Sequence, residues 1–343
     1  MGNGADKILS ICESYHIEVC DFFASDGFVR GHLFHGKRVL SYSEASEKYG
    51  RENMIVLLSF ASSLPDVLAN VYKIAEECEL YAPDVPVCGE NLFNYEFYKE
   101  NEDKIRETEL LLADARSVEV FADVVNYKLS GNVRFLQENH TDFAEVYSLL
   151  GAEKFERIAD LGAYNGDTLR EITPFAPNLK SAIAFEPDKR NHKKLSEYAE
   201  TVEAFKITPL KLAAWSNKAI LQFDGSGNRN STLITGGIAV NKPQKIVEVE
   251  ADSLDNILDG ERVDYIKYDV EGSEKEAILG SLKTIEAYRP ALMVSLYHRS
   301  EDIFALPLMI HEKFPDYKFY IRRREYIPAW DTVLIAVSTA NEK

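Results

Sequence analysis

The chain has 343 residues, an apolar fraction of 45% and a formal net charge of −17, which are values of a globular protein long enough for two domains. The negative charge argues against the basic face that nucleic-acid binding requires, so we expect no nucleic-acid partner. No apolar run approaches the roughly 20 residues of a membrane-spanning helix and no signal-peptide core follows the first residues, which predicts a cytoplasmic protein without a membrane span.

Residues 1–90 alternate strand and helix signals, which predicts a small open α/β domain. We expect strands at residues 17–23 and 54–60, and helices at residues 42–49 and 64–77. The run Gly2-Asn3-Gly4 stands where a glycine turn would follow a first strand, yet no strand precedes it. We therefore hypothesise that the domain lacks its first strand.

The first 150 residues also carry most of the negative charge, with about twice as many acidic as basic side chains. This acidic region is where we expect any protein partner or homo-oligomer contact. The four cysteines lie here as well, at Cys12, Cys20, Cys78 and Cys88, and none forms a C-x-x-C pair. This spacing predicts reduced thiols and no metal site.

Residues 91–150 have helix-like periodicity, and we interpret them as a helical connector between two domains. The clearest apolar faces are at residues 111–114 and 121–129, and His140-Thr141-Asp142-Phe143 has the character of a helix start. The alternative is that this segment covers an active site or binds an acceptor.

Residues 151–343 alternate strands and helices in the order of a doubly wound α/β sheet. A helix is expected at residues 188–200, and core strands are expected at residues 157–159, 181–185, 207–215, 263–269 and 291–297. Residues 219–224 and 245–250 read as an inserted hairpin, and the glycine-containing loop between them is expected to be mobile. Two strands, at residues 317–322 and 332–337, would close the chain as an antiparallel edge pair.

The only basic cluster, Arg322-Arg323-Arg324, falls at the end of the first of these two closing strands. Side chains on a strand alternate between its two faces, so we interpret the cluster as a solvated sheet edge. The alternative is an anchor for an acidic acceptor group.

The most informative segment is Asp160-Leu161-Gly162-Ala163-Tyr164-Asn165-Gly166, which separates a short apolar run from a helix start at Asp167-Thr168. A strand, a glycine turn and a helix in this order place backbone N–H groups around a ligand at the carboxyl end of the strand. A dinucleotide fold has G-x-G-x-x-G at this point, whereas this chain has D-x-G-x-x-x-G. Asp160 would repel a pyrophosphate and would suit a cationic ligand such as S-adenosylmethionine.

A second signal lies at Glu186-Pro187, which follows the next strand-like run. Nucleotide-binding βαβ units place an acid at this distance from the glycine turn, where it accepts hydrogen bonds from the ribose hydroxyls. The two signals together predict a nucleotide-like cofactor without a pyrophosphate.

From about residue 155 to residue 338 the sequence resembles the FkbM-type S-adenosylmethionine-dependent methyltransferases. The resemblance rests on the segments already quoted and on Ala213-Ala214-Trp215-Ser216, Ser253-Leu254-Asp255, Lys267-Tyr268-Asp269-Val270-Glu271-Gly272-Ser273-Glu274 and Tyr297-His298-Arg299. It implies a Rossmann-like methyltransferase domain, methyl transfer to oxygen and a Rossmann-like companion domain at the N-terminus. We therefore expect three parts: residues 1–90, the connector 91–150 and the methyltransferase domain 151–343.

The expected cofactor is S-adenosylmethionine, with S-adenosylhomocysteine as the product. Asp160 and the turn would hold its methionine part, Glu186 its ribose, and residues 212–215 its adenine, although Trp215 can equally be core packing. The candidate cofactor-binding residues are Asp160, Gly162, Ala163, Tyr164, Gly166, Asp167, Thr168, Glu186, Pro187, Ala214, Trp215 and Asp269.

The candidate catalytic residues follow the fourth and fifth core strands. Lys267, Asp269 and Glu271 alternate onto one strand face, where their charges should shift one another's pKa values. His298 ends the next strand and is the best-placed histidine for general-base work at neutral pH. Paired acids could instead bind a divalent metal with the acceptor, but nothing in the spacing demands a metal.

The leading interpretation is a methyltransferase acting on a hydroxyl of a small molecule, a sugar or a glycan, as in polysaccharide or secondary-metabolite modification. One alternative is an NAD-dependent oxidoreductase. The α/β domain expected at residues 1–90 could support this function, but it lacks a G-x-G-x-x-G motif. Another is a noncatalytic nucleotide-binding or scaffold protein that interacts through residues 1–150.

Overall fold

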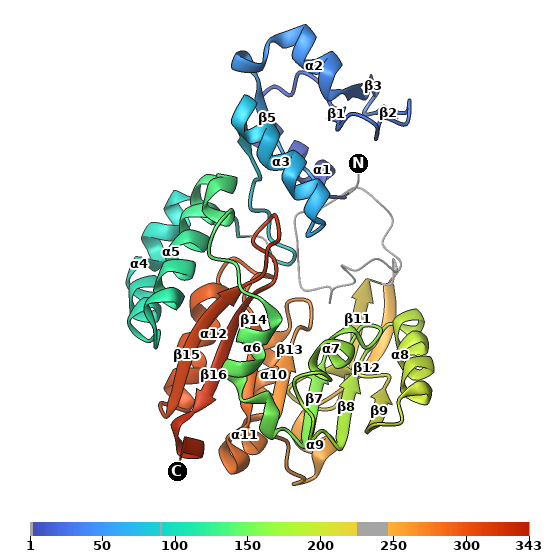
Figure 1. Ribbon diagram of the computed structural model, residues 1–343, viewed down its shortest axis with the longest axis vertical. Helices are drawn as coiled ribbons and strands as arrows, with labels where there is room; N and C mark the ends of the chain where they lie inside the picture. The colour runs from blue at the N-terminus through green and yellow to red at the C-terminus, as the bar shows by residue number, and fades with distance from the viewer. Residues whose placement is uncertain (1–2, 90, 225–245, 343) are drawn as a thin grey trace.

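The computed structural model describes residues 3–89, 91–224 and 246–342, and a seven-stranded sheet forms the centre of the second half of the chain (Figure 1). The strand order is β15-β16-β14-β13-β7-β8-β9. Strand β16 runs antiparallel to β14 and β15, and the other neighbouring pairs are parallel. The strands are β7 (Arg157–Leu161), β8 (Ser181–Phe185), β9 (Lys206–Leu210), β13 (Tyr265–Tyr268), β14 (Ala291–Ser295), β15 (Tyr317–Arg323) and β16 (Thr332–Ser338).

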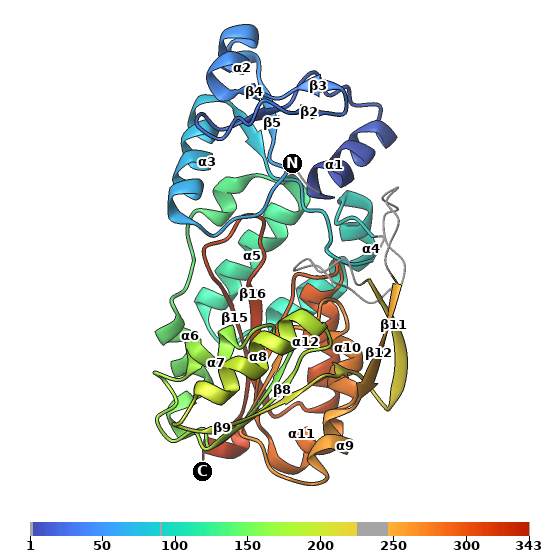
Figure 2. The same ribbon diagram turned by 90° about the vertical axis from the view of Figure 1, so that its right-hand side faces the viewer.

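Helices cover both faces of this sheet, as the doubly wound prediction required (Figure 2). One layer contains α6 (Phe143–Leu150), α7 (Asp167–Ile172) and α8 (Lys189–Thr201), and the other contains α10 (Glu274–Leu279), α11 (Leu282–Tyr288) and α12 (Asp302–Lys313). Strand β14 is buried along its whole length: Ala291 and Met293 belong to one apolar core, and Leu292 and Val294 to the other. A strand covered on both faces consists mostly of apolar residues, which explains the apolar run at residues 291–294.

The inserted hairpin is confirmed. Strands β11 (Ala219–Asp224) and β12 (Ile246–Asp252) pair antiparallel, and β12 also pairs with the short β10 (Ala213–Ala214). The glycine-containing loop that joins the hairpin falls outside the described residues. Helix α9 (Leu254–Leu258) follows, and Ser253 caps its start by accepting a hydrogen bond from the Asn256 N–H.

The region before residue 90 contains helices and short strands. The helices are α1 (Asn3–Ser14), α2 (Tyr42–Tyr49) and α3 (Pro65–Glu77), and the strands pair as β1 (Phe23–Ala24) with β4 (Leu40–Ser41), β2 (Leu33–Phe34) with β3 (Lys37–Arg38), and β5 (Ile55–Leu57) with β6 (Glu79–Tyr81). The strand expected at residues 17–23 is wrong except at Phe23, and Ile17 is more than half exposed. An apolar run forms a strand only where a neighbouring strand pairs with it, which pattern alone does not reveal.

The connector is helical and packs on the far edge of the sheet. Helix α4 (Tyr95–Leu110) contacts α12, and α5 (Ala115–Ser130) contacts β15. Asp142 caps α6 as expected, because its carboxylate accepts a hydrogen bond from the Glu145 N–H. The division of the chain into three domains remains a prediction.

This helical layer overturns the expectation of a solvated edge at the basic cluster. Arg322 and Arg323 are 3% and 1% exposed. Arg322 forms ion pairs with Asp114 and Glu145, while Arg323 donates hydrogen bonds to the carbonyls of Leu136 and Tyr326. The two closing strands do pair antiparallel, but β16 lies inside the sheet between β14 and β15.

Among the described residues, no helix combines the length and the apolar character that crossing a bilayer requires.

Candidate functional site

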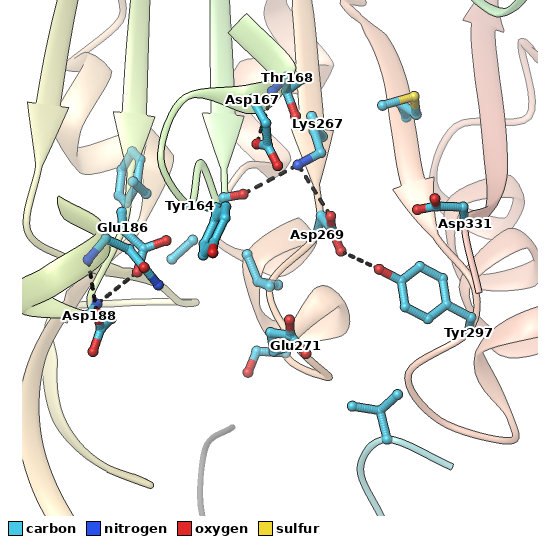
Figure 3. A pocket seen from close by; sticks show the side chains of 18 of the residues that line it. Tyr164, Asp167, Thr168, Glu186, Asp188, Lys267, Asp269, Glu271, Tyr297 and Asp331 are labelled. Atoms are coloured by element: carbon cyan, nitrogen blue, oxygen red, sulfur yellow. Dashed lines mark hydrogen bonds and ion pairs between the residues drawn. The ribbon is translucent and has the colours of Figure 1, made fainter. Parts of the chain in front are cut away.

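The carboxyl ends of β7, β8, β13 and β14 face a cavity of about 330 Å³ (Figure 3). Its floor is built from the turns after these strands. The opposite wall comes from Ser63 and Val87 in the front region and from residues 324–331, which join β15 to β16. The cavity therefore draws on segments far apart in the sequence.

The turn after β7 is held by backbone contacts. Gly162 has φ +89°, and a Cβ there would lie 1.8 Å from the main-chain oxygen of Asp269. The N–H groups of Gly162 and Ala163 both donate to the carbonyl of Phe185, and that of Gly166 donates to Ala163. These N–H groups are thus used within the protein, and the glycine at 162 allows the turn to pack directly against the residues after β13.

Asp160 is fully buried behind the cavity, where it forms an ion pair with Lys267. The Lys267 ammonium lies 3.5 Å from Oδ1 of Asp160 and 3.3 Å from Oδ2 of Asp269, and it donates to the carbonyl of Gly162. Burial raises the pKa of Asp160 to about 6, although Lys267 opposes this shift. Burial alone would lower the pKa of Lys267, but Asp160 and Asp269 outweigh it and raise the value. Lys267 is therefore a fixed cation that joins two carboxylates.

Asp269 lines the cavity and is held as an anion. Its Oδ1 accepts hydrogen bonds from the hydroxyls of Ser295 and Tyr297, both at 3.0 Å. Burial would raise the pKa of Asp269, but Lys267 and His298 overcome it and lower the value to about 2. A carboxylate with so low a pKa is a weak proton acceptor.

His298 lies beneath the cavity and does not line it. It is 0% exposed, with Nδ1 2.9 Å from Oε1 of Glu274 and Nε2 3.5 Å from Oε2 of Glu271 and 3.6 Å from Oδ1 of Asp269. Burial would lower the pKa of His298, but Glu274, Glu271 and Asp269 raise it to about 10. The imidazole is consequently a cation at neutral pH, and it lies among the carboxyl groups of Glu274, Glu271 and Asp269.

Glu271 differs from its neighbours because it both lines the cavity and has a high pKa. Its side chain is one-third exposed, toward a recess surrounded by protein, and this desolvation raises its pKa to about 8 despite the opposing charge of His298. Its backbone has φ +54°, an uncommon conformation for a residue with a side chain. The thiol of Cys88, in the segment that precedes the helical connector, donates a hydrogen bond to the Glu271 carbonyl at 3.0 Å.

The raised pKa of His298 predicts a pH-dependent stability. A histidine whose folded pKa lies above its unfolded value stabilises the fold fully below about pH 6.5 and loses that contribution as pH rises toward 10. Over this window the free energy of unfolding should fall by up to about 1.4 kcal/mol per pH unit for this one proton. Urea denaturation at several pH values should show that the free energy of unfolding falls less steeply with pH in His298→Gln than in the wild type.

The titration of His298 can also be followed without a variant that risks misfolding. NMR of the histidine side chains should show that the His298 imidazole stays protonated at pH 8. Loss of the His298 proton below pH 8 would contradict the charge assigned to this residue.

The second strand end places Glu186 in the cavity, 7% exposed, beside Pro187 and Asp188. Its carboxylate accepts a hydrogen bond from the Asp188 N–H, and burial raises its pKa to about 7. Leu212 and Ala214 form an apolar wall close by, and Trp215 lies outside the cavity lining. Of the other residues predicted for cofactor binding, Gly162, Tyr164, Asp167 and Thr168 line the cavity, while Ala163 and Gly166 lie behind it in the turn and at the start of α7.

Sequence reasoning missed the wall on the other side of the cavity. Arg324, Tyr326, Trp330 and Asp331 come from the loop between β15 and β16. No motif marks this loop, and the one available signal was the basic cluster that ends at Arg324. Ser63 and Val87 carried no chemical signal at all.

The spacing of Asp269, Glu274 and His298 would also suit a metal, because one ligand atom from each lies within 4.8 Å of the others. A metal would bind the neutral imidazole, so it would have to displace the proton that the neighbouring carboxyl groups hold on His298. The imidazolium already supplies a positive charge at this position.

A sheet of this order, with an acid at the end of its second strand and a ligand-sized cavity beyond the strand ends, defines a Rossmann-like α/β protein. Residues 160–328 match the family model described as Methyltransferase FkbM domain, and this part of the chain belongs to the FkbM methyltransferase family. The family resemblance and the fold class predicted from the sequence are both confirmed. Membership implies methyl transfer.

A solved structure agrees with this fold over most of the chain. A crystal structure of methyltransferase FkbM from Methylobacillus flagellatus KT is 21% identical, with a TM-score of 0.69 over 93% of this chain and 84% of that chain. Fibrillarin from Aeropyrum pernix, solved with S-adenosyl-L-methionine, is 11% identical, with a TM-score of 0.35 over 56% of this chain and 73% of that chain. A search of the curated proteins found no match.

Proposed function

We propose that the chain transfers a methyl group from S-adenosylmethionine to a hydroxyl of a small molecule, a sugar or a glycan. The charge of the cavity lining is the observation that supports S-adenosylmethionine as the cofactor. Among the residues that the structure describes, its lining has two basic side chains, Lys267 and Arg324, against seven acidic ones: Asp167, Glu171, Glu186, Asp188, Asp269, Glu271 and Asp331. Such a lining favours a cationic sulfonium and disfavours the pyrophosphate of NAD.

The residues present fit this cofactor part by part. Glu186 would accept hydrogen bonds from the ribose hydroxyls, and Leu212 and Ala214 would contact the adenine. The turn from Gly162 to Asp167 and the anionic Asp269 would flank the methionine end. When bound, the cofactor supplies a methyl group already activated by positively charged sulfur.

Among the four candidate catalytic residues, Glu271 is best suited to accept the proton of a hydroxyl. It lines the cavity, and its pKa of about 8 lies near neutral pH. Asp269 has too low a pKa, and Lys267 and His298 are cations. We infer that Asp269, Lys267 and His298 offset one another's charges and position Glu271.

Calorimetric titration with S-adenosylmethionine and S-adenosylhomocysteine tests the cofactor. We expect binding of both, and we expect Glu186→Ala to weaken it about 10- to 100-fold through the loss of charge-assisted hydrogen bonds. Glu197→Ala, an exposed position on α8, should leave binding unchanged. Absence of heat from both ligands with folded wild type would overturn the proposal.

A further inference from the structure

We propose that the side of the cavity away from Glu186 is an acceptor subsite for an uncharged, polyhydroxylated ring such as a saccharide, stacked on Trp330. This inference rests on the proposed methyl transfer and names the class of acceptor. Figure 3 shows the two sides, with Glu186 at one end and Tyr297 and Asp331 at the other.

Three aromatic side chains form this wall. The rings of Tyr297 and Trp330 lie with centroids 6.5 Å apart and an interplanar angle of 29°, and Tyr326 lies 5.8 Å from Trp330. All three are half-buried and line the cavity, so part of their surface remains available to a ligand. Aromatic faces pack well against the C–H groups of a saturated ring.

Contacts between two distant segments hold the wall in place. The N–H of Ser62 donates to the carbonyl of Ile327 at 2.9 Å, and the N–H of Ile327 donates to the carbonyl of Ser62 at 3.0 Å. The buried Arg323 also donates to the carbonyl of Tyr326. A loop tied at both points presents Trp330 and Tyr326 in fixed positions, which reduces the entropy lost on binding.

The charges on this wall select against anionic acceptors. Arg324 is the basic side chain of this wall, and it is already paired, with Nη1 2.9 Å from Glu171 and Nη2 3.6 Å from Asp331. Phosphate or carboxylate groups would meet Asp331 and Asp269, and among the described residues the two basic side chains of the lining, Lys267 and Arg324, are already paired. Carboxylates do accept hydrogen bonds from hydroxyl groups, so aromatic faces beside acids suit a neutral ring with several hydroxyls.

In the proposed transfer step, each bond formed is matched by a bond broken, and the proton has an acceptor. The oxygen of one ring hydroxyl forms a bond to the methyl carbon as the bond from that carbon to sulfur breaks. The hydroxyl proton passes to the Glu271 carboxylate, and the sulfonium becomes the neutral thioether of S-adenosylhomocysteine.

The test measures acceptor use with S-adenosylmethionine saturating. We would assay three matched sets: neutral methyl glycosides, sugar phosphates with uronic acids, and amino sugars, following formation of S-adenosylhomocysteine. We expect turnover of neutral glycosides, and for Trp330→Ala a KM raised roughly 10- to 30-fold. Trp330→Phe should recover most of this loss, and Tyr95→Ala, an exposed aromatic outside the cavity, should leave KM unchanged.

Calorimetry with S-adenosylhomocysteine on each variant separates the two proposals. Unchanged cofactor affinity with a raised KM for glycosides supports the subsite. Cofactor binding together with no neutral-glycoside turnover, a preference for anionic or amino acceptors, or an unchanged KM in Trp330→Ala would overturn it. Failure of the wild type to bind the cofactor would instead reject the methyltransferase function on which the subsite depends.

Discussion

Replacing Lys267 with methionine should lower the free energy of unfolding by about 3–5 kcal/mol at pH 8, because the change leaves Asp160 buried without its cation. The difference in the free energy of unfolding between Lys267→Met and the wild type should become smaller as pH falls toward 5. Asp160 has a pKa of about 6 even beside Lys267, so at low pH it is protonated in both proteins and no longer needs a partner. Urea denaturation at pH 5 and pH 8 measures both effects.

Two further variants make this result specific to the buried pair. Lys180→Met removes an exposed ion pair with Glu156 and should cost less than about 1 kcal/mol. Adding Asp160→Asn to Lys267→Met should restore part of the lost stability, because neither partner is then charged. Equal losses in Lys267→Met and Lys180→Met at pH 8 would contradict the role given to Lys267.

Replacing Glu271 with glutamine should lower kcat by about 10²- to 10⁴-fold while leaving cofactor affinity nearly unchanged. Glutamine keeps the size of the side chain but cannot accept a proton. For the wild type, kcat/KM should rise with pH and level off above about pH 8, because the raised pKa of Glu271 means that the carboxylate forms only there. Steady-state kinetics from pH 6 to pH 9.5 would show both results.

The control for Glu271 is Glu261→Gln, a change at a side chain that is 70% exposed. It should keep the wild-type rate and pH profile. If Glu271→Gln retained the rising pH profile at a similar rate, another group would have to accept the proton, and the proposed role of Glu271 would fail.

Several features of the fold follow from local sequence. The core strands expected at residues 263–269 and 291–297 are present as β13 and β14, and residues 291–294 are apolar because both faces of β14 are covered. The Asp142 cap was predictable because its carboxylate bonds a backbone N–H only three residues away. The glycine at 162 was recognised, although its reason is the contact with Asp269 rather than N–H groups offered to a ligand.

The candidate site was predicted in part. The strand-end rule brought Glu186, Lys267, Asp269 and Glu271 together, because parallel strands end at one edge of the sheet. His298 was expected to act as a base, yet its burial among three carboxylates makes it a cation. That charge depends on packing of α10 and the turn before it, which spacing along the chain does not specify.

By itself the sequence determined the α/β class, the succession of the core strands along the chain and the residues at their ends. These depend on hydrophobic periodicity and turn chemistry, which act over a few residues. The tertiary structure alone decided which side chains are buried together: the pairing of Asp160 with Lys267, the burial of Arg322 and the meeting of Ser62 with Ile327. Burial and the charges brought near one another set each pKa, and both arise only when segments distant in the chain pack together.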